Sequence, residues 1–167
     1  MTQRTITYLA RYLPDDLGDS PSQDLVDYYL PADQAHPTLR LRQSSHEFSL
    51  TKLGDATQEE QTITLVEDEF AALAEVEARV IRKTRYAYTH EGKIADIDVF
   101  EGPLAGLVVV QFELATDEEK QAFSMPDFCL ADVTHEAFVA EGMLAGMTYR
   151  EVEPHLHRFG YKRLVGS

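Results

Sequence analysis

The chain is predicted to fold as an α+β protein around a closed antiparallel barrel of about eight strands, with flanking and C-terminal helices. Two observations predict this architecture. Strand-like segments follow one another with short turns between them, and basic and apolar residues alternate within several of these segments. Because helices do not alternate regularly with strands, a parallel α/β sheet is the weaker interpretation.

Residues typical of strands run between turn residues along most of the chain. β-Branched, aromatic and alternating apolar residues predict the strands, and proline, glycine and serine clusters predict the breaks between them. In order, the expected strands cover residues 5–13, 24–30, 38–43, 48–53, 61–66, 79–88, 94–100 and 107–114. Pro14 and Pro31 end the first two, of which residues 24–30 also fit a turn of helix. Their meander order favours antiparallel pairing.

Helices are expected between the later strands and after them. Residues 67–77 place Phe70, Leu73 and Val76 on one side at helical spacing. Thr116 is a suitable N-cap for the acidic helix that follows it. Three short helical pieces are then expected at residues 134–140, 143–147 and 149–159.

The chain is strongly acidic. Its 167 residues contain 29 acidic and 15 basic side chains, for a formal net charge of -14. This balance repels nucleic-acid backbones and anionic membranes, so neither is expected as a partner. No apolar run approaches the ~20 residues of a membrane span. Residues 1–167 are therefore expected to form one soluble, cytoplasmic domain, with the single Cys129 buried as an inert thiol.

Basic residues recur at matching positions of four expected strands. Arg40 and Arg42 stand two apart, as do Lys83 and Arg85, so each pair shares one face of its strand. A closed barrel would bring these faces into one lumen, where arginine and lysine donors suit phosphate oxygens, while the leucines beside the arginines would face covering helices. The candidate phosphate-binding residues are Arg11, Arg40, Arg42, Lys52, Lys83 and Arg85. A solvated strand face also explains any single pair, so both interpretations stay open.

Acidic residues offer candidate ligands for a divalent metal. Triphosphate chemistry normally uses Mg²⁺ or Mn²⁺, held by a few carboxylates and bridged to the phosphates. Asp96 and Asp98 share one strand face, and Gln111 and Glu113 share another. The candidate metal ligands are Asp98, Glu113 and Asp132. On a chain this acidic, ordinary surface charge also explains each of them.

Short motifs lie in a fixed order along nearly the whole chain. They are Arg-Leu-Arg at 40–42, Leu-Thr-Lys at 50–52, Lys-Thr-Arg-Tyr at 83–86, Ile-Asp-Val-Phe at 97–100, Gly-Leu at 106–107, Pro-Asp-Phe at 126–128, Asp-Val-Thr at 132–134 and Met-Leu-Ala at 143–145. In this order they resemble the R-x-R, Leu-Thr-x-Lys, K-x-R-Y, I-D-x-F, G-L, P-D-W, E-V-T and N-x-x-L-A marks of the CYTH domain, the fold of the triphosphate tunnel metalloenzymes. The lysine of the second mark stands one place early.

The resemblance implies an eight-stranded antiparallel tunnel. In that family, basic residues lining the tunnel hold triphosphate, and glutamates hold a divalent metal. The family's activities include inorganic triphosphatase, thiamine-triphosphatase, RNA triphosphatase and one class of adenylate cyclase.

This chain carries mostly neutral residues where the family carries its metal-binding glutamates. The corresponding positions are Thr7 and Leu9 in the first strand, Thr62 and Thr64 in the fifth, and Gln111 ahead of Glu113 in the eighth. A two-residue slip of the fifth strand would instead bring Glu60 onto the face of Thr62. Arg11 keeps the base of the family's E-x-E-x-K strand.

The sequence therefore predicts a divergent tunnel protein that binds triphosphate, polyphosphate or another phosphorylated small molecule, with reduced or lost hydrolysis. Each lost pair between a metal ion and a carboxylate is worth roughly 4 kcal/mol at an effective dielectric of about 20. The affinity for Mg²⁺ or Mn²⁺ should therefore be weak, and the anion should bind without added metal. One alternative is an active Mg²⁺-dependent triphosphatase. Another is a structural or partner-binding module in which Asp96, Asp98, Glu113 and Asp132 neutralise the bases.

Overall fold

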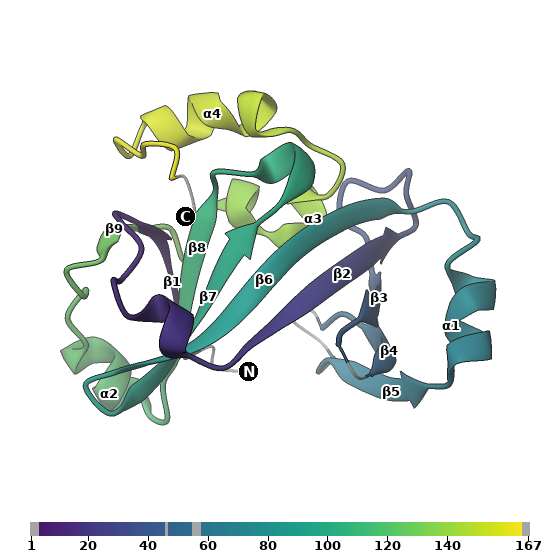
Figure 1. The fold of residues 1–167 in the computed structure, drawn as a ribbon, viewed down its shortest axis with the longest axis horizontal. Coiled ribbons are helices and arrows are strands. Elements are labelled where there is room, and N and C mark those ends of the chain that lie inside the picture. The colour runs from purple at the N-terminus through teal and green to yellow at the C-terminus, as the bar shows by residue number, and fades with distance from the viewer. Residues whose placement is uncertain (1–3, 46, 55–57, 165–167) are drawn as a thin grey trace.

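Nine antiparallel strands form one sheet in the structure, a computed structural model that describes residues 4–45, 47–54 and 58–164. The strands are β1 (Thr5–Ala10), β2 (Ser22–Leu30), β3 (Leu39–Gln43), β4 (Phe48–Lys52), β5 (Gln61–Leu65), β6 (Arg79–His90), β7 (Lys93–Phe100), β8 (Val108–Glu113) and β9 (Cys129–Asp132). Their order across the sheet is β5-β4-β3-β2-β6-β7-β8-β1-β9. The sheet is strongly twisted, with β3 to β5 at one end and β1 and β9 at the other (Figure 1).

The sheet is open, so the prediction of a closed eight-stranded barrel is wrong in both closure and strand number. Closure requires the two edge strands to pair with each other at a consistent stagger. Among the described residues the edges are β5 and β9, and each of them pairs on one side only, with β4 and β1 respectively. The additional strand, β9, lies in a region where only helices were expected. The antiparallel α+β class is confirmed.

All eight expected strands are present as β1 to β8, with ends that differ by a few residues. The helices are α1 (Glu67–Leu73), α2 (Asp117–Ala122), α3 (Glu141–Leu144) and α4 (Tyr149–His157), with short 3₁₀ turns at Leu17–Asp19, Gly102–Leu104 and Ala137–Val139. Thr116 caps α2 as predicted, because its side chain accepts a hydrogen bond from the backbone N–H of Glu119. Thr148 and Glu151 form a capping box at the start of α4.

Helices cover both faces of the sheet. On one face, Phe70 and Leu73 of α1 pack against Leu41 of β3 and its neighbours. On the other, Val152 and Leu156 of α4 pack with apolar residues of β1, β2, β7 and β8 in the largest cluster. Figure 1 shows α3 and α4 together over the end of the sheet formed by β6, β7 and β8. The part of this second face that α3 and α4 do not cover carries the polar side chains described below.

Cys129 is 1% exposed, and burial raises the pKa of its thiol to about 12, as expected for an inert buried cysteine. None of the helices formed by the described residues is both long and apolar enough to cross a bilayer.

Candidate functional site

Four of the predicted bases lie on one face of the sheet. The register of β3 with β2, and of β2 with β6, puts Arg40 and Arg42 on the same side as Lys83 and Arg85. Directly opposed residues of antiparallel strands share a face, and every second residue along a strand lies on that same face. The prediction that these four bases share one face is confirmed, whereas the closed lumen that they were expected to enter is not formed by the open sheet of the described residues.

The opposite face of β3 is apolar. Leu39 and Leu41 pack in a cluster with Phe70 of α1. The sequence prediction that these two leucines face a covering helix is therefore confirmed.

The other two predicted bases lie elsewhere. Lys52 is opposite Leu39 in the register of β4 with β3, so it lies on the face that α1 covers and not on the face of Arg40. β1 ends at Ala10, where the pairing with β9 is irregular, and Arg11 follows it as an exposed residue. Neither base is among the residues that line the cavity described next.

The shared face is hollowed into a cavity of about 750 Å³. Arg40 of β3 and Glu113 of β8 both line it although three strands lie between them, so the sheet curls around the cavity. Its charged lining consists of three arginines and four carboxylates, namely Arg40, Arg42, Arg85, Glu60, Asp98, Glu113 and Glu141. The cavity lining thus carries both positive and negative charges.

Lys83 and Arg85 are ion-paired at the inner end of the cavity. Lys83 is 1% exposed and donates to Asp98 at 2.9 Å and also to Glu141. Arg85 forks onto the same aspartate, with Nε 2.8 Å from Oδ1 and Nη2 3.0 Å from Oδ2. Burial tends to lower the pKa of Arg85, but the hydrogen bonds and charge of Asp98 raise it overall. Arg85 therefore stays charged.

Arg42 is paired in the same way with an acid that the sequence analysis did not select. Its Nε and Nη2 atoms each lie 2.7 Å from one oxygen of Asp27, which is fully buried. Burial tends to lower the pKa of Arg42, and the Asp27 hydrogen bonds more than offset that effect. Asp27 lies between Val26 and Tyr28 of β2, and an acid flanked by apolar residues in a strand is the sequence signal that could have found it.

Glu141, at the start of α3, is the second carboxylate that sequence reasoning missed. Besides Lys83, it accepts a hydrogen bond of 2.6 Å from the Tyr29 hydroxyl, and its Oε1 lies 3.9 Å from Nη2 of Arg85. Burial tends to raise the pKa of Glu141, but Lys83, Tyr29 and Arg85 together lower it well below its usual range. With leucine and alanine at 144 and 145, position 141 is where the N-x-x-L-A mark has asparagine.

Arg40 differs from the other three bases because its side chain donates no hydrogen bond to any of the described residues. Its Nη2 lies 3.7 Å from Oε1 of Glu60, beyond hydrogen-bond distance. Its Nε is buried and has no hydrogen-bond partner in the part of the chain that the structure describes. Arg40 is therefore the cavity base with the most capacity to bind a ligand.

The three predicted metal ligands have different surroundings. Asp98 lines the cavity, but both of its oxygens are engaged by Lys83 and Arg85. Asp132 accepts hydrogen bonds from the backbone and side chain of Thr134 and lies outside the cavity lining. Glu113 does line the cavity. Within residues 4–45, 47–54 and 58–164, no three His, Cys, Asp or Glu side chains group in a way that could hold a metal ion.

A smaller hollow of about 480 Å³ shares Glu113 and Gln111 with the cavity and is also lined by Asp96 and Thr5. Burial raises the pKa of Asp96, the Arg85 charge opposes this, and the nearby Asp98 and Glu113 add to it. Asp96 and Glu113 are thus two close carboxylates in this smaller hollow, which adjoins the cavity at Gln111 and Glu113.

The sequence left open whether Thr62 or Glu60 of the fifth strand faces the cavity, and both do. Thr62 is opposite Thr51 of β4, and the two hydroxyls are 2.8 Å apart. Thr51 in turn is opposite Arg40, so Thr62 belongs to the cavity face. Glu60, two residues earlier, lines the cavity itself.

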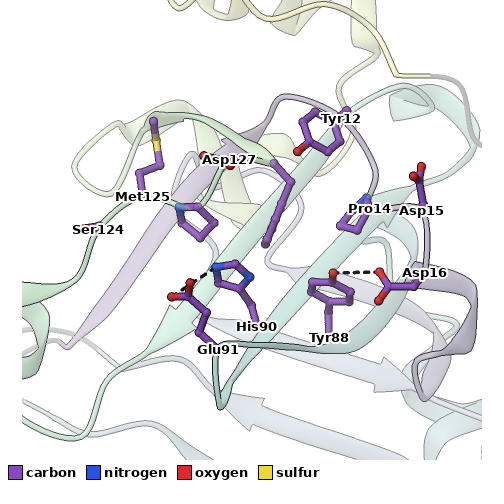
Figure 2. A pocket seen from close by; sticks show the side chains of 12 residues that line it. Tyr12, Pro14, Asp15, Asp16, Tyr88, His90, Glu91, Ser124, Met125 and Asp127 are labelled. Atoms are coloured by element: carbon purple, nitrogen blue, oxygen red, sulfur yellow. Dashed lines mark hydrogen bonds and ion pairs between the residues drawn. The ribbon is translucent and has the colours of Figure 1, made fainter.

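A second hollow of about 480 Å³ lies on the other face of β6, where Tyr88 and His90 alternate with the cavity-facing residues. Figure 2 shows its aromatic and acidic lining, in which the Tyr88 hydroxyl donates to Asp16 at 2.9 Å. Its lining contains acids such as Asp127 and no lysine or arginine among the described residues, so it does not suit an anion.

Fold and site together define the class, an α+β protein whose curled antiparallel sheet holds a cavity of arginines and carboxylates. No family model matches the chain. Over 140 residues it is 30% identical to the inorganic triphosphatase of Nitrosomonas europaea, covering 81% of this chain and 91% of that protein. The chain therefore belongs to the CYTH family that its motifs indicated.

Solved structures agree with this assignment. The crystal structure of the inorganic triphosphatase NE1496 is 27% identical, with a TM-score of 0.69, and the match covers 87% of this chain and 95% of that one. A second crystal structure, of the hypothetical protein NE1496, matches with the same identity and TM-score over 88% of this chain and 99% of that one.

Proposed function

We propose that the cavity binds inorganic triphosphate or another short polyphosphate through Arg40, Arg42 and Arg85. The observation that carries this proposal is the buried Nε of Arg40, which has no hydrogen-bond partner among the described residues and belongs to the cavity lining. Leaving such a donor unpaired costs free energy, which a phosphate oxygen would recover. The similarity to an inorganic triphosphatase supports this choice of ligand.

The charge balance favours a metal complex of the anion over the free anion. The lining has three arginines and four carboxylates, and Lys83 and Asp27 are buried directly behind them. The charges of the site therefore sum to a negative value, which repels a triphosphate unless a cation accompanies it. The expectation of metal-free binding followed from the retained bases and the missing family glutamates, and it did not include Asp27 and Glu141.

Asp96 and Glu113 fit a divalent cation that arrives with the phosphate. In the part of the chain that the structure describes, neither forms an ion pair within 4.0 Å. Mg²⁺ in such sites is usually held by one or two carboxylates and completes its coordination with phosphate oxygens and water. When bound, the ion would neutralise charge on the phosphates and polarise them.

We expect hydrolysis to be slow. Thr7 and Gln111, at family glutamate positions, put neutral side chains on the cavity face, and Leu9 is fully buried in the apolar cluster. The chain's own residues can bind and orient the anion but offer few carboxylates to activate water. The second candidate function is an active Mg²⁺-dependent triphosphatase, which the 30% identity to an enzyme of that activity favours.

Calorimetric titration with tripolyphosphate, in MgCl₂ and in EDTA, tests the proposal. We expect binding in MgCl₂ and loss of at least about tenfold in affinity for Arg40→Ala, equal to about 1.4 kcal/mol. The matched control is Arg82→Ala, an exposed arginine that alternates onto the other face of β6. Binding that Arg40→Ala leaves unchanged would refute the proposed site. Phosphate release with Mg²⁺ at a rate typical of enzymes, about 1 per second or faster, would favour the second candidate.

A further inference from the structure

Glu141 occupies a position that a phosphate oxygen could take. Its carboxylate accepts from the Lys83 ammonium and from the Tyr29 hydroxyl, and it lies 3.9 Å from Arg85. An ammonium and a guanidinium are also the donors that recognise phosphate. The Glu141 side chain is 22% exposed and lines the cavity, so an incoming anion can reach it.

The charges at the inner end of the cavity are balanced because of Glu141. Two bases, Lys83 and Arg85, face two carboxylates, Asp98 and Glu141. Without the glutamate, this end would carry a net positive charge and would attract a free anion.

Glu141 is fixed in this place by the packing of α3. Leu144 is fully buried and Ala145 is 1% exposed, so the end of the helix is anchored in the apolar core. At the other end, Gly142 lies so close to Pro37 that a Cβ added to it would be 3.1 Å from the proline Cδ. The helix therefore holds the carboxylate against the bases instead of leaving it free in solvent.

We propose that Glu141 is a built-in counter-anion that competes with phosphate for Lys83 and Arg85, and so makes anion binding depend on a divalent cation. This inference rests on the proposed function of the cavity. A cation that neutralises part of the phosphate charge lowers the repulsion from Glu141, whereas a free polyphosphate meets it in full. Glu141 is thus a specificity-determining residue for metal-complexed over free anions.

The decisive variant is Glu141→Gln, which keeps the size of the side chain and removes its charge, while its one amide oxygen can still accept from either Lys83 or Tyr29. We expect its affinity for tripolyphosphate in EDTA to rise at least about tenfold, while the affinity in MgCl₂ changes less. The ratio of the two affinities therefore shrinks. Glu75→Gln, a carboxylate-to-amide change at an exposed residue outside the cavity lining, is the matched control and should leave the ratio unchanged.

Tyr29→Phe gives an independent measurement if Glu141→Gln folds poorly. It removes the 2.6 Å hydrogen bond that anchors Glu141 and leaves every charge in place. The glutamate then yields more easily to phosphate, so affinity in EDTA should rise, by less than in Glu141→Gln. A purely structural role for Glu141 predicts lower stability in both variants without a gain in metal-free affinity.

The outcomes separate this inference from the proposed function. If the wild-type protein binds tripolyphosphate in MgCl₂ but neither variant gains affinity in EDTA, the role of Glu141 is refuted and the binding site stands. If neither the wild-type protein nor Glu141→Gln binds tripolyphosphate in either buffer, both the function and the inference are refuted.

Discussion

Arg42 and Asp27 form a two-pronged ion pair between neighbouring strands, with both nitrogen–oxygen distances at 2.7 Å. Asp27 is fully buried, so this pair belongs to the interior of the curled sheet and not to its surface. The pair fixes the guanidinium of Arg42 on the cavity face that Arg40 shares. Carboxylates thus pair with three of the four bases inside the curled sheet, through Asp98, which was expected, and through Asp27 and Glu141, which were not.

Asp27→Asn should destabilise the protein by about 3 kcal/mol, since removing one member of a buried pair leaves the other charge uncompensated. Urea unfolding of the variant and the wild-type protein measures this difference. Asp33→Asn, at an exposed residue, is the control and should change stability by less than about 0.5 kcal/mol. Equal unfolding midpoints for Asp27→Asn and the wild-type protein would show that the pair contributes nothing to stability.

Glu141 should make stability depend on acid pH. Its pKa in the folded protein is lowered, so its contribution is present above the ordinary glutamate pKa of about 4.3 and is lost as the pH falls through the folded value. Thermal unfolding from pH 7 down to pH 2 should therefore show a steeper loss for the wild-type protein than for Glu141→Gln. Parallel curves for the two proteins would contradict the lowered pKa.

Asp96 should have the opposite effect. Its pKa is raised, mainly by burial, so the folded protein binds this proton more readily than the unfolded chain and its charge costs stability at neutral pH. Asp96→Asn should therefore raise the melting temperature at pH 7, and the gain should disappear as the pH falls through the raised pKa. A variant that melts lower than the wild-type protein at pH 7 would argue instead for a favourable interaction with Arg85.

The sequence was sufficient for the parts of the site that depend on strand alternation. Arg40, Arg42, Lys83 and Arg85 were predicted to share one face, and the register confirms it. Lys52 could not be placed in this way, because a shift of one residue in a strand moves a side chain to the other face.

Carboxylates at positions where the family motifs have no acid were harder to predict. Glu141 reaches the cavity from a short helix far along the chain, and only tertiary packing brings it to Lys83. β9 escaped prediction because it is only four residues long, too short for an alternating pattern to stand out. Closure of the sheet likewise depends on how its two edges meet, which no local pattern specifies.

Thr7→Glu combined with Gln111→Glu should create metal affinity beside Asp96 and Glu113. The two residues are opposite each other in β1 and β8, with Gln111 Nε2 3.4 Å from the Thr7 hydroxyl, and Gln111 is also opposite Asp96. The new carboxylates would join Asp96 and Glu113, giving enough oxygen ligands for Mg²⁺ or Mn²⁺. Leu9, the remaining family glutamate position of β1, is excluded because it is fully buried among apolar residues and a charge there would unfold the core.

Calorimetric titration with MnCl₂ should detect binding to this double variant that is at least about tenfold tighter than to the wild-type protein, since each added carboxylate contributes favourable charge interaction with the ion. Each single substitution should do less, because one carboxylate must still compete with the repulsion from Arg85. Gln121→Glu, which adds an acid to the exposed surface of α2, is the control for net charge. If the double variant binds Mn²⁺ no better than this control, the missing glutamates are not what limits metal binding, and slow hydrolysis would need another cause.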